Sequence, residues 1–207
     1  MDATDPDVPF SVRHFDAQFR RQVTQGQFEL NPFERAALPH LRGDVLDAGC
    51  GLGNLALAAA ERGCPVLALD ASPAAIEHLR AAAAARSLPV RAERADLAAY
   101  APPVAAFDAV VAIGLLMFFD CPTARRQLTR LQAAVRPGGV AVVNVLVEGT
   151  TWLEPFGGGA HCLLKADEVR RAFAGWTRVH DREQAFDAPD GSVKRFVTVI
   201  AQRPTAR

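Results

Sequence analysis

The chain has 207 residues, of which 50% are hydrophobic and 22% are charged, an ordinary composition for a globular protein. Its 23 Lys and Arg residues balance its 23 Asp and Glu residues, so net charge gives no general attraction to nucleic acid. No apolar run could span a bilayer, and the first residues lack the basic and apolar regions of an export signal. We therefore expect a cytoplasmic monomer or homodimer without membrane or nucleic-acid partners.

The cysteines are Cys50, Cys64, Cys121 and Cys162. They follow no metal-ligand spacing and lack the density of a disulfide-stabilised domain. We expect them to be reduced, in keeping with a cytoplasmic location, and we expect no metal site.

The polar residues 1–9, which include two prolines, predict a flexible N-terminus before a single domain over residues 10–207. Apolar residues at helical spacing predict a helix from about residue 10 to 23, and Asn31-Pro32 predicts the start of a second helix that ends near Leu41. These two helices (residues 10–41) could simply cover one face of a sheet. Alternatively, the first could close a ligand pocket, which makes His14 a candidate substrate contact.

Residues 44–54 read as a buried strand, an acid (Asp47), a turn with three glycines, and the start of a helix over about 53–62. Such a strand, turn and helix form a cradle for a nucleotide cofactor. The glycine spacing is G-x-G-x-G, however, whereas dinucleotide folds use G-x-G-x-x-G. Asp47 would also repel a pyrophosphate, but it would attract a ligand that carries positive charge.

Two further acids follow the same pattern. Asp70 ends a short apolar strand over residues 65–70 and lies 21 positions after Gly49, where nucleotide folds place the acid that binds ribose. A helix that begins at Ser72 then leads to a strand over residues 90–97, which contains Asp96. The alternative for both acids is a structural role, as a helix cap or as a solvated residue at a strand end.

Residues 107–114 predict a fourth strand, followed by the apolar stretch 115–119, a helix over about 123–135, a tight turn at 136–139 and a fifth strand over 140–147. Alternating strands and helices with nearly continuous apolar strands indicate a parallel sheet covered on both faces. Ligands bind at the carboxyl ends of such strands, which is where the acids described above and Gly114 fall.

The C-terminal part begins with a glycine-rich stretch, residues 148–161, that contains Trp152, Phe156 and His161. It is either a lid over the pocket or a plain surface loop. A helix over 165–175 follows, and then two strands, about 176–186 and 193–202, joined by an Asp-Gly turn. The predicted fold is α/β: a doubly wound, mostly parallel seven-stranded sheet that ends in an antiparallel hairpin.

The glycine turn, the acids that end the strands and the antiparallel ending resemble the class I methyltransferases that depend on S-adenosylmethionine (SAM). The resemblance implies SAM as the cofactor. It implies that Asp70 accepts hydrogen bonds from the ribose hydroxyls, that Asp96 and the backbone of Leu97 bind adenine, and that Asp47 faces the positively charged end. The implied cofactor contacts are Asp47, Ala48, Gly49, Gly51, Gly53, Asp70, Ala71, Asp96, Leu97 and Gly114.

Within this class, residues 116–119, 136–139, 167–176 and 195–198 resemble the tellurite-resistance methyltransferases. The final strands of that family carry a His-Arg pair and a further Arg, whereas residues 184–187 read Gln-Ala-Phe-Asp here. The candidate substrate contacts are His14, Phe118, Trp152, Phe156, His161 and Arg195. The implied acceptor is a small molecule, either a chalcogen oxyanion or a thiol.

Methyl transfer from a sulfonium needs alignment of donor and acceptor more than it needs acid or base chemistry. The sequence offers no convincing pair of a histidine and a carboxylate as a base, so we assign no catalytic residue. Two other functions stay open: a nicotinamide-dependent oxidoreductase, and a SAM-binding protein without catalysis.

Overall fold

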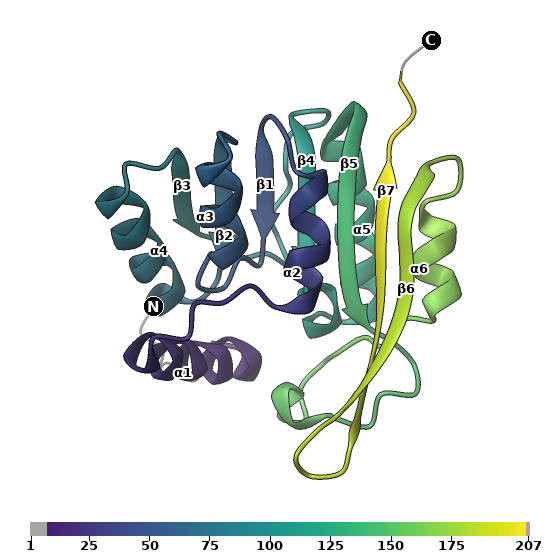
Figure 1. Ribbon diagram of the computed structural model, residues 1–207. Helices are drawn as coiled ribbons and strands as arrows, with labels where there is room; N and C mark the ends of the chain where they lie inside the picture. Colours follow the sequence, from purple (N-terminus) through teal and green to yellow (C-terminus); the bar gives the residue numbers. More distant parts are fainter. Residues whose placement is uncertain (1–7, 206–207) are drawn as a thin grey trace.

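The computed structural model describes residues 8–205, so most of the predicted flexible N-terminus (residues 1–9) lies outside the described residues. Val8 is buried, and Pro9 directly precedes the first helix. The described chain forms a seven-stranded sheet in the order β3-β2-β1-β4-β5-β7-β6 (Figure 1). The predicted fold class is confirmed.

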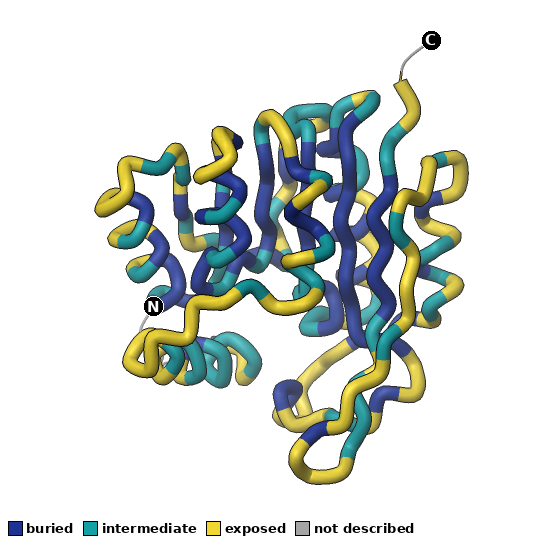
Figure 2. The backbone as a smooth tube through the Cα atoms, viewed as in Figure 1, coloured by how far each residue is buried: buried dark blue, intermediate teal, exposed yellow. Residues whose placement is uncertain are grey.

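The first five strands are mutually parallel, and the last two run antiparallel to their neighbours. The strands are β1 (Val45–Ala48), β2 (Val66–Asp70), β3 (Val90–Arg94), β4 (Phe107–Ile113), β5 (Val135–Leu146), β6 (Thr177–Asp187) and β7 (Val193–Gln202). The central strands consist mainly of small and β-branched apolar residues and are buried on both faces (Figure 2), as expected for a parallel sheet between helices.

Helices cover the sheet in two layers, each with its own apolar core. One core contains buried residues of α3 (Asn54–Glu61), α4 (Pro73–Ala85) and the end of α2 (Pro32–Ala37). The other contains those of α5 (Cys121–Ala134) and α6 (Ala166–Ala172). Short 3₁₀ turns, η1 (Leu38–His40), η2 (Leu116–Phe118) and η3 (Glu154–Phe156), complete the set of elements.

The prediction of a tight turn at residues 136–139 is wrong, because β5 continues through these residues. Val135 pairs with Phe107, the register then shifts, and Val140 pairs with Ala109. Gly138 lies in this bulge with a φ of +80°, a conformation that glycine adopts without strain. The turn signal in the sequence therefore marks an irregular strand rather than a chain reversal.

Helix α1 (Phe10–Gln25) lies across the carboxyl edge of the sheet (Figure 1). The buried Asp16 fixes it there: its Oδ1 accepts hydrogen bonds from Ser72 Oγ at 2.6 Å and from the Ala74 N–H at 3.0 Å. Burial alone would raise the pKa of Asp16, but these bonds and Arg20 hold the pKa below its ordinary value. An ionised Asp16 at the N-terminus of α4 thus anchors α1 over the edge where ligands bind.

Candidate functional site

A cavity of about 1060 Å³ lies at the carboxyl ends of β1, β2 and β4, between these strand ends and α1. The predicted site residues in its wall are Asp47, Gly49, Gly51, Gly53, Asp70, Ala71, Asp96, Leu97, Gly114, Phe118, Trp152 and Phe156. Ala48, a buried residue of β1, does not contribute to the wall.

The glycine turn forms one side of this cavity, with its three glycines and also Cys50 and Leu52 in the lining. Gly49, Gly51 and Gly53 have φ values of +77°, +52° and +75°, which disfavour any residue with a Cβ. A Cβ on Gly51 would lie 3.1 Å from the Phe19 ring of α1, and one on Gly53 would lie 2.4 Å from Leu79. A Cβ at either position would therefore meet α1 or α4, so these glycines let both helices pack against a turn whose glycines also line the cavity.

Asp70, at the end of β2, is held in place by backbone donors. Its Oδ2 accepts from the Gly51 N–H and its Oδ1 from the Ser72 N–H, both at 2.9 Å. Burial raises its pKa above the ordinary value, although these hydrogen bonds oppose the increase. Each oxygen retains a lone pair, so the carboxylate can accept from two neighbouring hydroxyl groups of a ribose.

Asp47, at the end of β1, is only 4% exposed, and its Oδ2 has no hydrogen-bond partner among the described residues. Burial, together with the nearby Glu34 and Asp70, raises its pKa to about 8. A buried oxygen without a partner is costly, so this atom is matched to a ligand that donates hydrogen bonds or carries positive charge. An ammonium group supplies both.

Asp96 lies just beyond β3, and its Oδ1 accepts from the Ala98 N–H at 2.9 Å. This bond shapes the turn that brings Asp96 and the buried Leu97 to the cavity. An exposed carboxylate can accept from the amino group of a base. The apolar side chain beside it can cover the ring of that base.

The other side of the cavity is aromatic. Phe118 of η2 contacts Phe15 of α1 at 5.0 Å between ring centroids, and it contacts Phe156 of η3 at 5.3 Å. Trp152 completes this wall, and Lys194 Nζ lies 3.8 Å from the centre of its ring. Rings from α1, from η2 and from residues 148–161 therefore meet, although they lie far apart in the sequence.

Three predicted substrate contacts do not belong to the wall. His14 packs between Phe10 and Phe15. His161 stacks on Phe156 with ring centroids 4.4 Å apart, and its side chain is exposed. Arg195 is exposed as well. The structure thus places no histidine or arginine of the described chain in the cavity wall.

Sequence reasoning missed several residues of the wall, including Phe15, Phe19, Glu34 and Asn144. Asn144 of β5 is fully buried; its Nδ2 donates to Thr198 Oγ1 of β7 at 2.9 Å, and its Oδ1 has no described partner. A polar residue inside an otherwise apolar strand was the available signal for Asn144. The spacing of Phe15 and Phe19 showed a helix but did not show which element the helix would face.

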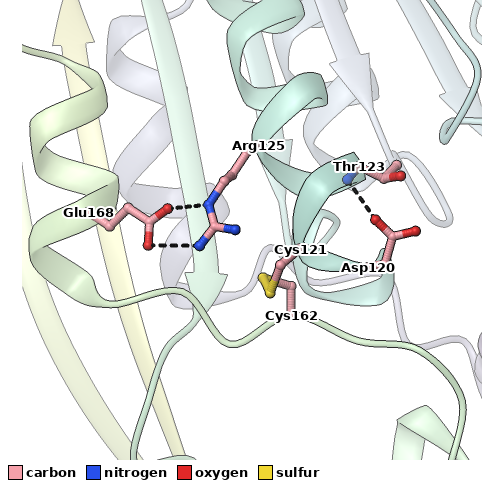
Figure 3. The surroundings of a disulfide bond; sticks show 6 residues. All are labelled: Asp120, Cys121, Thr123, Arg125, Cys162 and Glu168. Carbon is pink, nitrogen blue, oxygen red and sulfur yellow. Dashed lines mark hydrogen bonds and ion pairs between the residues drawn. A yellow bond between two sulfur atoms is a disulfide. The ribbon is translucent and has the colours of Figure 1, made fainter.

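The expectation that all cysteines are reduced is wrong. Cys121, at the start of α5, forms a disulfide with Cys162, which follows the segment 148–161 (Figure 3). Nearby, Arg125 of α5 pairs with Glu168 of α6, so two links join these parts of the chain. Because disulfides are rare in the cytosol, the cysteine argument no longer supports a cytoplasmic location.

Two absences bear on the site. No group of three or more His, Cys, Asp or Glu side chains within residues 8–205 could hold a metal ion. Over the same residues, none of the helices is long and apolar enough to cross a membrane.

A family model described as a methyltransferase domain matches residues 45–139. Hemagglutinin 1 of Eikenella corrodens is 30% identical over 166 residues, which make up 77% of this chain and 54% of that protein. A solved structure that concerns the conversion of a disulfide bond into a thioacetal group during echinomycin biosynthesis is 28% identical, with a TM-score of 0.67 and coverage of 95% of this chain and 93% of that one. TehB from Haemophilus influenzae has a TM-score of 0.72 at 16% identity and shares the fold over 88% of this chain and 65% of its own.

These matches and the site geometry agree. Residues 45–139 match a methyltransferase domain, and the described fold and site fit those of the class I enzymes that use S-adenosylmethionine. The structural similarity to TehB shows a shared fold and no more. The chain spans about half or less of the length of the first curated relatives it matches.

Proposed function

We propose that this chain transfers a methyl group from bound SAM to a small-molecule acceptor held in the same cavity. The observation that carries the proposal is one cavity with acids at the strand ends and the glycine turn on one side and aromatic rings on the other. SAM supplies an electrophilic methyl group on a positively charged sulfur. The protein has to bind the donor and the acceptor, align them, and exclude water from the cavity.

The described residues fit this cofactor. The unpartnered Oδ2 of Asp47 would accept from its ammonium group, Asp70 would accept from the ribose hydroxyls, and Asp96 with Leu97 would hold adenine. The glycine turn would pass close to its methionine part. The remaining proposed contacts are backbone groups of Gly49, Gly51, Gly53, Ala71 and Gly114.

For the acceptor, we favour sulfur over a chalcogen oxyanion. An oxyanion needs cationic or hydrogen-bonding partners when it leaves water, and the described wall contains no Lys, Arg or His. The similar solved structure that concerns the conversion of a disulfide bond into a thioacetal group also points to sulfur chemistry. Phe118, Trp152 and Phe156 would contact such an acceptor directly.

The central test is calorimetric titration of the purified protein with S-adenosylhomocysteine, with NAD titrated in parallel. We expect micromolar binding of S-adenosylhomocysteine and none of NAD. The reverse result would favour the oxidoreductase alternative.

A second step separates an enzyme from a SAM-binding protein without catalysis. Purified protein is incubated with SAM and sulfur acceptors, thiols and thioethers in separate reactions, and the formation of S-adenosylhomocysteine is measured by mass spectrometry. Turnover above the rate of a Gly51→Val control supports the proposal. Sedimentation analysis in the same buffer decides between the expected monomer and homodimer.

A further inference from the structure

The cavity wall is one-sided in charge. Its acidic residues are Glu29, Glu34, Asp47, Asp70, Asp96 and Asp120. No Lys, Arg or His among residues 8–205 lines it, and residues 1–7 contain none in their sequence. An anionic acceptor would therefore lose its hydration and lie among like charges, with no cationic side chain in the wall itself to pair with it. The wall selects against anions.

The aromatic side of the cavity suits positive charge as well as apolar groups. The face of an aromatic ring is electron-rich and attracts cations. The ring of Trp152 already holds Lys194 Nζ at 3.8 Å from its centre. Phe15, Phe118 and Phe156 form the continuous ring series described above, and Phe156 is only 3% exposed.

The cavity also lacks a suitable base near these rings. Asp120 already accepts from the Thr123 N–H at 2.7 Å, and this bond lowers the pKa of the carboxyl, which weakens it as a proton acceptor. The rings of His14 and His161 are stacked outside the wall, and His161 Nδ1 lies 3.1 Å from the carbonyl oxygen of Gly159. Asp120 and the two histidines therefore offer no good proton acceptor beside these rings.

We propose that the acceptor is an uncharged aromatic or heteroaromatic molecule whose attacking atom carries no proton, such as a thioether sulfur or a tertiary nitrogen. The inference rests on the proposed methyltransferase function. The lone pair of the acceptor atom forms the new bond to the methyl carbon while the methyl–sulfur bond breaks and its electron pair returns to the sulfur. The positive charge moves from donor to acceptor and no proton is released. The charge thus stays inside a cavity of carboxylates and rings, and the product is a sulfonium or quaternary ammonium cation.

The test uses protein saturated with S-adenosylhomocysteine and three phenyl probes: thioanisole as the neutral acceptor, dimethyl(phenyl)sulfonium as its methylated product, and benzenesulfonate as the anion. Binding is measured by calorimetry and by tryptophan fluorescence. We expect the sulfonium to bind about tenfold more tightly than thioanisole, as a partly desolvated cation–π contact allows, and benzenesulfonate to bind at least tenfold more weakly than thioanisole. Benzenesulfonate binding as tightly as thioanisole would overturn the inference. So would a sulfonium that shows no advantage or no binding at millimolar concentration.

Variants assign the effect to the rings. Phe118→Leu keeps an apolar side chain but removes the ring face, so the preference for the sulfonium should fall below about threefold while S-adenosylhomocysteine still binds. Trp152→Leu provides a second variant on a loop, and Phe28→Leu, an exposed ring outside the wall, is the matched control. An unchanged preference in both wall variants would overturn the assignment. Failure of S-adenosylhomocysteine to bind the wild-type protein would instead contradict the proposed function itself.

Discussion

The two sides of the cavity are built in different ways. On the cofactor side, Asp47, Asp70 and Asp96 lie at or just beyond the ends of strands, so the register of the sheet places them. On the acceptor side, rings such as Phe15, Phe118 and Phe156 come from separate segments and meet only by packing. The first side therefore identifies the class of protein from local sequence. The second side determines the acceptor, and its composition becomes visible only in the folded chain.

The largest expected effect is on the cofactor side. Gly51→Val puts a branched side chain at a φ of +52° and against the Phe19 ring, where a Cβ alone would lie at 3.1 Å. We expect affinity for S-adenosylhomocysteine to fall on the order of a hundredfold or more, measured by calorimetry.

Gly63→Val is the matched control for Gly51→Val. Gly63 also has a positive φ, +87°, but its Cβ would meet nothing within 4 Å and it lies outside the cavity wall. The Gly63→Val variant should suffer backbone strain of about 1–2 kcal/mol, and it should bind S-adenosylhomocysteine as tightly as wild type does. Equal loss of binding in the two variants would mean that strain, and not occupation of the turn, accounts for the effect.

The next largest effect should be confined to the acceptor side of the cavity. Replacing both Cys121 and Cys162 with Ser opens a disulfide between positions 41 residues apart, which we expect to cost about 2–4 kcal/mol of unfolding free energy. The segment 148–161 carries Trp152 and Phe156, so limited proteolysis should cut it faster in this variant.

Affinity for S-adenosylhomocysteine should stay within about twofold of wild type in the same double variant, because no cofactor contact is touched. A large loss would show that the aromatic side also holds the cofactor. Reduction of the wild-type protein with dithiothreitol should reproduce the proteolysis pattern, whereas Cys50 and Cys64, which are free and buried, should not contribute.

A smaller effect is expected from Asp70→Ala. Loss of a charged acceptor for two hydroxyl groups should weaken S-adenosylhomocysteine binding by about 1–3 kcal/mol, or about 5- to 150-fold. Because Asp70 also accepts from the Gly51 and Ser72 N–H groups, Asp70→Asn is the informative comparison. It keeps one acceptor oxygen and should fall between alanine and wild type. Unchanged affinity in Asp70→Ala would remove this residue from the ribose site.

The fold could be predicted almost entirely from sequence, because each strand and helix has its own period and its own boundary residues. Ser72, for example, accepts from the Ala75 N–H as a helix cap and is followed by Pro73, and both signals are local. The turn expected at 136–139 failed because glycine and proline also mark a bulge, and only the pairing of Val135 with Phe107 tells the two apart.

The site could be predicted only where the backbone alone determines it. Nothing local distinguishes Asp16, which anchors α1, from an ordinary surface acid of a helix, because its partner Ser72 lies 56 residues away. The same limit explains His14, Arg195 and the disulfide of Cys121. Their surroundings depend on how α1, the hairpin and the segment before α6 pack on the rest of the chain, and no sequence period encodes that packing.

The smallest expected effect concerns the pH dependence of stability through Asp47. The folded pKa of about 8 lies far above the ordinary value of 3.8, so between these limits the folded state holds a proton that the unfolded state has lost. Stability from this group is fully present below about pH 4, declines as pH rises, and is lost above about pH 8. Asp47→Asn removes this titrating group, so the stability of the variant relative to wild type should increase as pH rises from 5 to 8.5. At pH 8.5 we expect a difference of about 1 kcal/mol or more in the free energy of unfolding, seen as a difference of roughly 2–4 °C in melting temperature.

The exposed Asp187→Asn serves as the control for this experiment, and its melting temperature should follow that of wild type across the range. Glu34 and Asp70 also have raised pKa values, so part of the pH dependence should survive in Asp47→Asn. Binding of S-adenosylhomocysteine brings an ammonium group to Asp47 and favours its ionised form. Wild type should therefore release a proton on binding near pH 7, measured by calorimetry in buffers of different ionisation enthalpy, and Asp47→Asn should release less. Equal release by both proteins would place the cofactor's ammonium group away from Asp47, which would leave the burial of this acid without a partner to balance it.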